Sequence, residues 1–322
     1  MSGSVAVRGH VLALSGGVGG AKLAAGLANI LPPDQLTIAV NTGDDFEHLG
    51  LTICPDIDSV VYALAGLNDT ERGWGVTGET WQAMDMLRRL GQPDWFNLGD
   101  RDMAMHLARS HHLRSGESLS EATARLSHAL EIAHAVVPMS DAPVRTQVET
   151  EQGWLDFQHW FVREQCGPAV RGIRFAGTPG AMPAPGLAAA LARDDLGAVI
   201  ICPSNPFVSV DPILAVEGVE QRLRERDVPV IAVSPLVGGK AIKGPLAKML
   251  AELGLACNNY AIADHYSGLV DHLLIDEADA DEAHDLRASG VAVTVSATVM
   301  CSADDRRRLA REALSTAGIV IT

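Results

Sequence analysis

The segment His10-Val-Leu-Ala-Leu-Ser15-Gly-Gly-Val-Gly-Gly20-Ala-Lys22 decides the fold of this chain. The apolar residues 11–14 predict a buried strand, the glycines predict a loop, and a helical pattern follows over residues 22–30. Free N–H groups and the positive end of the helix dipole meet at such a junction, which favours phosphate binding. We therefore predict a nucleotide-phosphate site that contains the loop residues Ser15, Gly16, Gly17, Gly19, Gly20 and Lys22.

The glycine loop matches neither common nucleotide-binding motif. A Walker loop requires Gly-Lys-Ser/Thr, but Ala21 separates Gly20 from Lys22. The dinucleotide motif requires a third glycine at the position that Lys22 occupies. The prediction is therefore a non-standard phosphate site, and a glycine-rich turn without a ligand is the alternative.

Apolar runs that alternate with helical patterns extend over much of the chain. This arrangement is typical of a doubly wound, mostly parallel α/β sheet covered on both faces. Strands are predicted at 11–14, 36–40, 199–202, 230–233, 272–275 and 291–295, and helices at 22–30, 57–67, 212–226, 245–253, 277–288 and 304–314. Residues 1–68 and 194–322 are predicted to form this core. Residues 69–193 are predicted to be an inserted cap with helices at 77–90, 101–110 and 119–130 and a β-hairpin of 144–150 and 154–159.

Composition excludes several classes of partner. The chain has 25 Lys and Arg residues against 40 Asp and Glu residues, a formal net charge of −15. This balance argues against binding to nucleic acid or to anionic membranes. No apolar run approaches the ~20 residues of a membrane span, and no leader pattern is evident, so a cytoplasmic protein is expected. Five scattered cysteines without a Cys-x-x-Cys pair argue against a disulfide framework or a zinc ribbon.

Carboxylates follow the second predicted strand. Asn41-Thr-Gly-Asp44-Asp45 ends that strand, and Pro55-Asp56-Ile-Asp58 begins the next helix. Adjacent carboxylates are costly unless solvent or a cation neutralises them, and oxygen ligands of this kind suit Mg²⁺. Helix capping by Asp56 is an equally good explanation for that residue.

Three further loops carry polar side chains. Ser204-Asn205-Pro206 offers a hydroxyl and an amide, although a plain turn is nearly as good an explanation. The loop from Ser234 to Gly244 places Lys240 and Lys243 beside glycines, which favours phosphate binding over a solvated charge pair. Trp74-Gly-Val-Thr-Gly-Glu-Thr80 could stack on a planar ring or form part of a lid.

Six of these motifs, taken in order, resemble the 2-phospho-L-lactate transferase family. They are Leu14–Lys22, Asn41–Asp45, Pro55–Asp58, Phe96-Asn-Leu-Gly-Asp-Arg-Asp102, Ser204–Pro206 and Ser234–Lys240, and the resemblance extends over residues 10–318. It implies a Rossmann-like core, Mg²⁺ dependence and a step in the synthesis of the deazaflavin coenzyme F-420. In that step a 2-phospholactate, phosphoenolpyruvate or 3-phosphoglycerate group moves from its guanosine diphosphate conjugate to the ribityl hydroxyl of 7,8-didemethyl-8-hydroxy-5-deazariboflavin (Fo), and GMP is released.

The resemblance also implies roles for particular residues. Asp44, Asp45 and Asp58 would hold the metal. The glycine loop, Ser204, Asn205, Lys240 and Lys243 would bind the nucleotide, and Asp45, Trp74 and Thr80 would contact the acceptor. Asp45 and Lys240 would be catalytic. A homodimer and a partner guanylyltransferase are expected from the same resemblance.

Two other functions fit parts of the pattern. A non-catalytic, nucleotide-sugar-binding regulatory protein would share the glycine loop and the aspartate-rich loop. An NAD(P)-dependent oxidoreductase is disfavoured by the missing third glycine and by Asn41, which occupies the position of a ribose-binding acid. The sequence does not indicate which three-carbon acid the donor carries.

Overall fold

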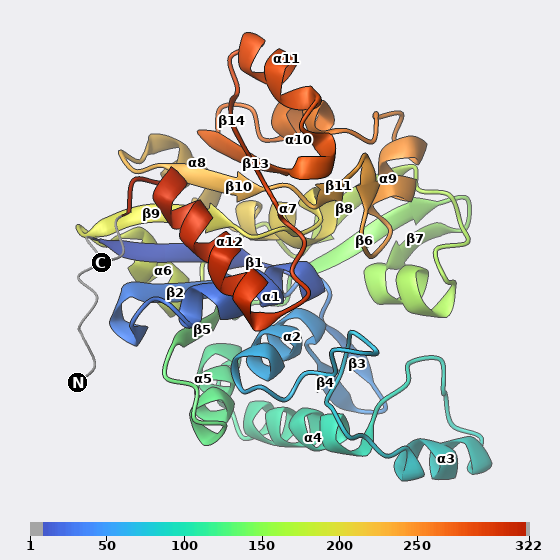
Figure 1. Ribbon diagram of the computed structural model, residues 1–322. Coiled ribbons are helices and arrows are strands. Elements are labelled where there is room, and N and C mark those ends of the chain that lie inside the picture. Colours follow the sequence, from blue (N-terminus) through green and yellow to red (C-terminus); the bar gives the residue numbers. More distant parts are fainter. Residues whose placement is uncertain (1–8, 320–322) are drawn as a thin grey trace.

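A computed structural model describes residues 9–319, and its centre is a sheet of parallel strands. In these residues the sheet has seven strands in the order β14-β13-β10-β9-β1-β2-β5 (Figure 1). The strands are β1 His10–Ser15, β2 Leu36–Val40, β5 Ala135–Pro138, β9 Leu196–Ile201, β10 Val230–Val233, β13 His272–Asp276 and β14 Ala292–Ser296. The mostly parallel α/β fold predicted from the apolar runs is confirmed.

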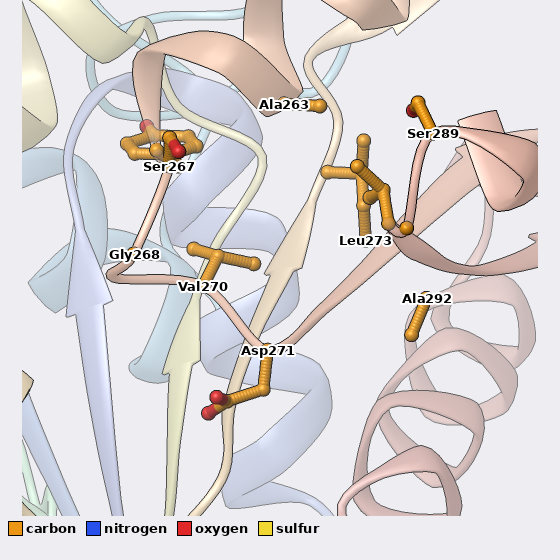
Figure 2. A pocket seen from close by; sticks show the side chains of 11 residues that line it. Ala263, Ser267, Gly268, Val270, Asp271, Leu273, Ser289 and Ala292 are labelled. Carbon is orange, nitrogen blue, oxygen red and sulfur yellow. The ribbon is translucent and has the colours of Figure 1, made fainter.

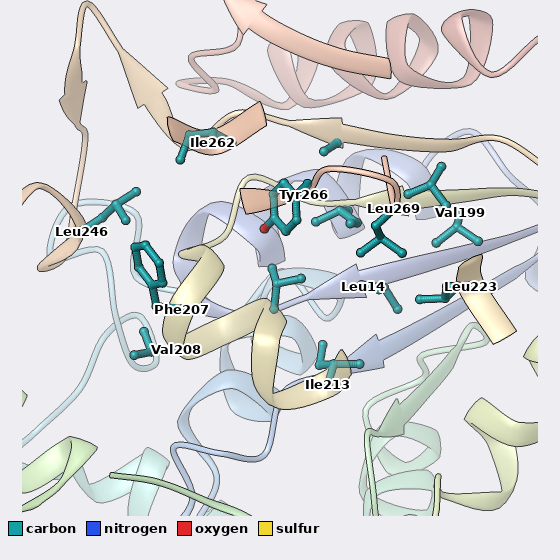
Figure 3. Packing of buried hydrophobic residues seen from close by; sticks show 14 of the residues in the cluster. Leu14, Val199, Phe207, Val208, Ile213, Leu223, Leu246, Ile262, Tyr266 and Leu269 are labelled. Carbon is teal, nitrogen blue, oxygen red and sulfur yellow. The ribbon is translucent and has the colours of Figure 1, made fainter. Parts of the chain in front are cut away.

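Helices cover both faces of the sheet because successive strand side chains point in opposite directions. In β1, Val11 and Ala13 belong to one buried cluster and Leu12 and Leu14 to the other. The first face packs against α1 Gly17–Ala28, α2 Pro55–Leu64 and α12 Ala303–Thr316. The second packs against α6 Pro185–Leu191, α7 Asp211–Leu214, α8 Val219–Glu225, α9 Leu246–Glu252, α10 Asn259–His265 and α11 Glu282–Ala288. Figure 3 shows this second face, where Leu14 and Val199 of the strands meet Ile213 and Leu223 of the helices.

The predicted insertion also contributes to the central sheet. Strand β5 pairs in parallel with β2 as the edge strand, and α6 packs against both. The run Ala-Val-Val-Pro is short, and its proline ends the strand at the sheet edge, where a missing N–H donor costs little. The prediction that residues 69–193 only cap the core therefore missed this edge strand. The domain boundaries themselves stay a prediction.

The cap elements lie beyond the β2–β5 end of the sheet (Figure 1). They comprise the helices α3 Gln82–Arg89, α4 Asp100–Arg114 and α5 Leu119–Ala129. The hairpin of β3 Phe46–His48 and β4 Leu51–Ile53 packs with them, although residues 1–68 were predicted to belong to the core. Phe46, Ile53, Met84 and Leu98 form a small separate core there. A second group, β6 Arg145–Thr150, β7 Gly153–Asp156 and β8 Gly172–Ala176, forms an antiparallel sheet. The predicted hairpin is β6–β7, and β8 was not predicted.

The predicted helices differ from the observed ones in their bounds, and three of the differences have a clear structural description. Helix α1 begins at Gly17, so its first turn lies inside the glycine run. The helix predicted over 212–226 is divided into α7 and α8, because Gly218 adopts a φ of +77° before α8. The helix predicted over 277–288 becomes a 3₁₀ turn, Glu277–Asp279, followed by α11. Across residues 9–319, no helix combines the length and apolar character needed to cross a bilayer.

Candidate functional site

The loops that follow β1 and β9 meet where the strand order reverses. Strand β1 pairs with β2 on one side and with β9 on the other, so the chain leaves β1 in one direction and later returns on its other side. Ligands of open α/β sheets bind at such a point. Here the Ser204 hydroxyl donates to Gly16 O at 2.8 Å and accepts from Gly16 N at 3.2 Å. The structure thus brings together two of the predicted site segments.

Close packing explains part of the glycine run. Gly17 adopts a φ of +65°, a conformation that residues with a Cβ rarely adopt. A Cβ on Gly19 would lie 2.4 Å from Pro203 O, and one on Gly20 would lie 2.7 Å from the hydroxyl of Ser15. Small residues therefore let the first turn of α1 dock against the loop after β9. The alternative explanation of these glycines, a turn needed for packing, has direct support.

Protein carboxylates already occupy backbone N–H groups that we predicted for phosphate. Gly17 N donates to Asp56 Oδ1 at 2.7 Å. In the second glycine loop, Gly238 N and Gly239 N donate to the two oxygens of Asp279 at 2.9 and 2.7 Å. A phosphate on these amides would have to displace a carboxylate. Asp56 caps α1, a different helix from the one that sequence reasoning assigned to it.

A buried acidic group lies just past β2. The Asn41 amide donates to Asp44 Oδ1 at 3.1 Å and to Asp56 Oδ2 at 2.9 Å. Burial and the nearby Asp56 carboxylate raise the pKa of Asp44 well above its usual range. Burial also raises the pKa of Asp56, to about 6, although hydrogen bonds from Asn41 and Gly17 oppose the shift. The Asn41 amide thus bridges the two buried carboxyl groups by hydrogen bonds but carries no charge to neutralise them.

Asp45 is the acid in this group whose properties best match a proton acceptor. Its side chain is buried, and Oδ1 has no hydrogen-bond partner within residues 9–319. Burial raises its pKa to about 7, while the charge of Arg145 and the hydrogen bond from the Cys54 thiol oppose that shift. A carboxylate with a pKa near neutrality can remove a proton effectively at physiological pH.

Asp58 is held by an arginine. The guanidinium of Arg109, on α4, donates to both carboxylate oxygens of Asp58. In the described part of the chain, Asp58, Asp102 and His106 form the cluster whose ligand atoms lie within 4.8 Å of one another. The adjacent positive charge of Arg109 disfavours a cation there. The three predicted metal ligands, Asp44, Asp45 and Asp58, do not form such a cluster.

The predicted nucleotide-binding side chains are not all free. Lys22 Nζ is half-buried and donates to Met300 O at 2.8 Å, so it points toward the β14–α12 connection. The Asn205 side chain accepts from Phe207 N at 3.0 Å and caps the following turn. Lys240 and Lys243 are exposed near the carboxyl edge of the sheet.

Two of the three predicted acceptor residues, Trp74 and Thr80, are exposed on the cap, whereas Asp45 is buried. Trp74 is 44% exposed, and the Arg72 guanidinium lies 5.0 Å from its ring and 5.0 Å from that of Trp81. Thr80 donates to Asp100, which in turn accepts from the first N–H groups of α3. Their position relative to a substrate stays a prediction.

Shallow pockets lie at the opposite edge of the sheet. One, of about 230 Å³, is lined by Val270, Asp271 and Leu273 at the start of β13 and by Ala292 at the start of β14 (Figure 2). No predicted site residue lines it. It therefore does not enter the candidate site.

Sequence reasoning missed Cys54, Asp102, His106, Arg109 and Arg145. The helical spacing of Asp102, His106 and Arg109 was the available signal, since it places all three on one face of a helix.

Comparison with known proteins identifies the family. Residues 11–316 match the family model described as 2-phospho-L-lactate transferase CofD. A phosphoenolpyruvate transferase of Streptomyces coelicolor is 37% identical over 314 residues, which cover 96% of this chain and 98% of that protein. A 2-phospho-L-lactate transferase of Methanosarcina acetivorans is 36% identical and covers 93% of this chain and 96% of its own length. A solved structure of a UPF0052 family member from Bacillus halodurans has the same fold, with a TM-score of 0.62, 18% identity and coverage of 95% of this chain and 99% of that one. The chain therefore belongs to the 2-phospho-L-lactate transferase family.

Proposed function

We propose that this protein transfers a phospho-organic-acid group from its guanosine diphosphate conjugate to the ribityl hydroxyl of the deazaflavin Fo. Family membership supports a transferase of this kind. The observation that carries the proposal is Asp45. It is a buried carboxyl group, one of its oxygens has no hydrogen-bond partner in the described residues, and it lies just beyond the end of β2.

In this reaction the ribityl oxygen attacks the phosphorus that bears the three-carbon acid. The new O–P bond forms as the phosphoanhydride bond breaks, and GMP leaves with the electron pair. Asp45 accepts the hydroxyl proton as attack proceeds. Positioning and charge stabilisation supply most of the acceleration in such transfers.

The adjacent carboxyl groups of Asp44 and Asp45 offer oxygen ligands of the kind that a divalent cation prefers. Burial disfavours the ionised form of both groups, so a bound cation would stabilise them. We propose Asp44 and Asp45 as ligands of Mg²⁺. Asp58, the third predicted ligand, fits less well because Arg109 already occupies its oxygens. When bound, Mg²⁺ would neutralise charge on the donor phosphates.

Lys240 and Lys243 supply positive charge near this edge of the sheet. Neither lysine belongs to an ion pair in the part of the chain that the structure describes. We propose that they attract the donor phosphates and that Lys240 stabilises charge on the leaving GMP. A homodimer, and a guanylyltransferase that supplies the donor, remain predictions from the family resemblance.

Mass spectrometry tests the function. The protein is incubated with Fo, Mg²⁺ and, separately, the guanylated conjugates of 2-phospholactate, phosphoenolpyruvate and 3-phosphoglycerate. The proposal expects one donor to give GMP and a deazaflavin heavier by the phospho-acid group, and Asp45→Asn to give neither. If wild-type protein binds Fo but leaves it unmodified with every donor, the proposal is wrong and the regulatory-protein alternative is favoured.

A further inference from the structure

Helix α4 turns a polar stripe toward the inside of the protein. Asp102, His106, Arg109 and Ser110 are each at most 8% exposed, and their spacing places them on one face of the helix. Leu107, on another face, is 51% exposed. An ordinary surface helix has the reverse arrangement, with apolar residues inside and charges outside. Hydrophobic burial therefore does not explain how this face of α4 is held.

Arg109 is the centre of the stripe. It is 1% exposed, and its guanidinium donates to both oxygens of Asp58, which lies in the first turn of α2. The same group lies 3.3 Å from His106 Nδ1 and 3.4 Å from Thr52 O. Bidentate contact of this kind fixes the orientation of a carboxylate as well as its position.

The other members of the stripe complete a network between α4, α2 and β4. Tyr62 of α2 donates to Asp102 Oδ1 at 2.6 Å. His106 lies between the two acids, with Nδ1 3.5 Å from Asp58 Oδ2 and Nε2 3.3 Å from Asp102 Oδ1. Thr52 N of β4 donates to the Ser110 hydroxyl at 2.8 Å. Each polar residue of the stripe thus has a partner on an element that borders the acidic site.

A chain of contacts connects Arg109 with Asp45. Asp58 N donates to Cys54 O at 3.0 Å, which closes the first turn of α2. Phe46 of β3 pairs with Ile53 of β4 in an antiparallel hairpin, and this pairing brings their chain neighbours Asp45 and Cys54 together at the end of the hairpin. Holding Asp58 therefore fixes the turn that carries Cys54, and Cys54 borders the proposed proton acceptor.

The energetics favour positioning over stability as the role of the stripe. Burying charged groups costs several kcal/mol for each ion, and well-packed apolar residues often replace a buried ion pair without loss of stability. A stripe of leucines could hold α4 as firmly. It could not hold a carboxylate in one orientation at the edge of the site.

We infer that Arg109 is a positioning residue: through Asp58 and the first turn of α2, it holds Cys54 and Asp45 in the geometry that transfer requires. Arg109 contacts no substrate in this account. The inference rests on the proposed function, because Asp45 is taken as the residue that receives the proton.

The test compares Arg109→Lys with wild-type protein in the transfer assay. Lysine keeps the charge but cannot make the bidentate contact. We expect kcat to fall about tenfold to a hundredfold, in line with a small misplacement of a reacting group, while KM for both substrates stays within about twofold. Arg114→Lys is the matched control, because Arg114 lies at the end of the same helix and donates to Gly50 O. It should keep wild-type kinetics.

A double-mutant cycle separates positioning from a general loss of structure. Thermal unfolding of each variant gives the fraction of folded protein at the assay temperature, and each rate is divided by that fraction. If Arg109 acts through Asp58, Asp58→Asn should reduce kcat much less in the R109K background than in wild-type protein. Should R109K fail to fold, His106→Gln replaces it in the cycle, because His106 contacts the same carboxylate.

Three results would overturn the inference. They are wild-type kcat in R109K, a loss of activity that vanishes once rates are expressed per folded molecule, and additive effects of the two substitutions. Failure of the proposed function can be distinguished from failure of this inference. If the proposed function is wrong, the wild-type protein itself gives no turnover with any of the three donors. In that case the positioning inference fails with it.

Discussion

Substituting Asp45 by Asn should abolish transfer and, in metal-free protein, make the fold more stable. Asparagine keeps the shape of the side chain but carries no charge and cannot accept the hydroxyl proton. The wild-type carboxyl group is buried, so its ionised form is poorly solvated in the folded protein. Removing the charge therefore removes a cost of folding as well as the catalytic group.

The size of the stabilisation depends on pH in a definite direction. Burial raises the pKa of Asp45 from 3.8 to about 7. Between these values the folded protein keeps a proton that the unfolded chain releases, so wild-type stability falls as pH rises through this window. Asn at this position does not titrate. Linkage then predicts that the advantage of D45N grows by about 3 kcal/mol between about pH 5 and about pH 8.

Urea unfolding followed by tryptophan fluorescence, with EDTA present, measures this difference at both pH values. Asp281→Asn serves as the control, because Asp281 is exposed and its side chain does not cap α11. This variant shows the effect of an Asp-to-Asn change at an exposed position. An advantage of D45N that is constant, or that shrinks as pH rises, would refute the claim that Asp45 is a buried carboxyl group with a raised pKa.

Three other substitutions test how the loops are built. Gly19→Ala should lower the free energy of unfolding by about 1–3 kcal/mol, because the added Cβ would lie 2.4 Å from Pro203 O; unchanged stability in urea would contradict the packing explanation. Lys22→Met should lower the free energy of unfolding by about 1–3 kcal/mol, because the hydrogen bond to Met300 O is lost. Calorimetry should show little change in the affinity for GDP. A large loss of affinity would instead support the predicted nucleotide contact. Asp279→Asn should weaken GDP binding by loosening the loop that carries Lys240, and unchanged affinity would exclude that role.

The strands of the core could be predicted because they are apolar throughout. In a parallel sheet both faces are covered, so a run such as residues 36–40 stands out from its polar surroundings. Strand β5 lacks that signal. It is four residues long and ends in Pro138, and half of its side chains are not buried. Its place in the sheet depends on pairing with β2, a contact that no local pattern records.

The glycine run shows how a correct motif can carry an incomplete interpretation. Sequence reasoning predicted a loop because glycine is a poor helix former. In the structure the run forms the first turn of α1, because the gain from docking closely on Pro203 outweighs that propensity. The N–H group of Gly17 donates to Asp56 Oδ1, so a ligand would have to displace that carboxylate. Asp56 is 39 residues away in sequence, so nothing near the motif indicated this partner.

The candidate site could be predicted in part. Asp44 and Asp45 were predicted because adjacent carboxylates at a strand end are costly unless solvent or a cation neutralises them, and their role stays a prediction. The partner of Asp58 was not found, because Arg109 lies 51 residues further along the chain. Pairing of distant charges depends on how the cap docks against the core. The pairing of Arg109 with Asp58 follows from the packing of α4 against β4, and no short segment of the sequence indicates it.

A crystal structure with GDP and Mn²⁺ in place of Mg²⁺ would locate the proposed metal and nucleotide sites together. Anomalous scattering locates the metal without ambiguity. We expect a Mn²⁺ peak within coordination distance of Asp44 and Asp45, with the diphosphate beside it at the ends of β1 and β2. Metal and nucleotide bound at the opposite edge of the sheet, near Asp271 and Ala292 (Figure 2), would contradict it.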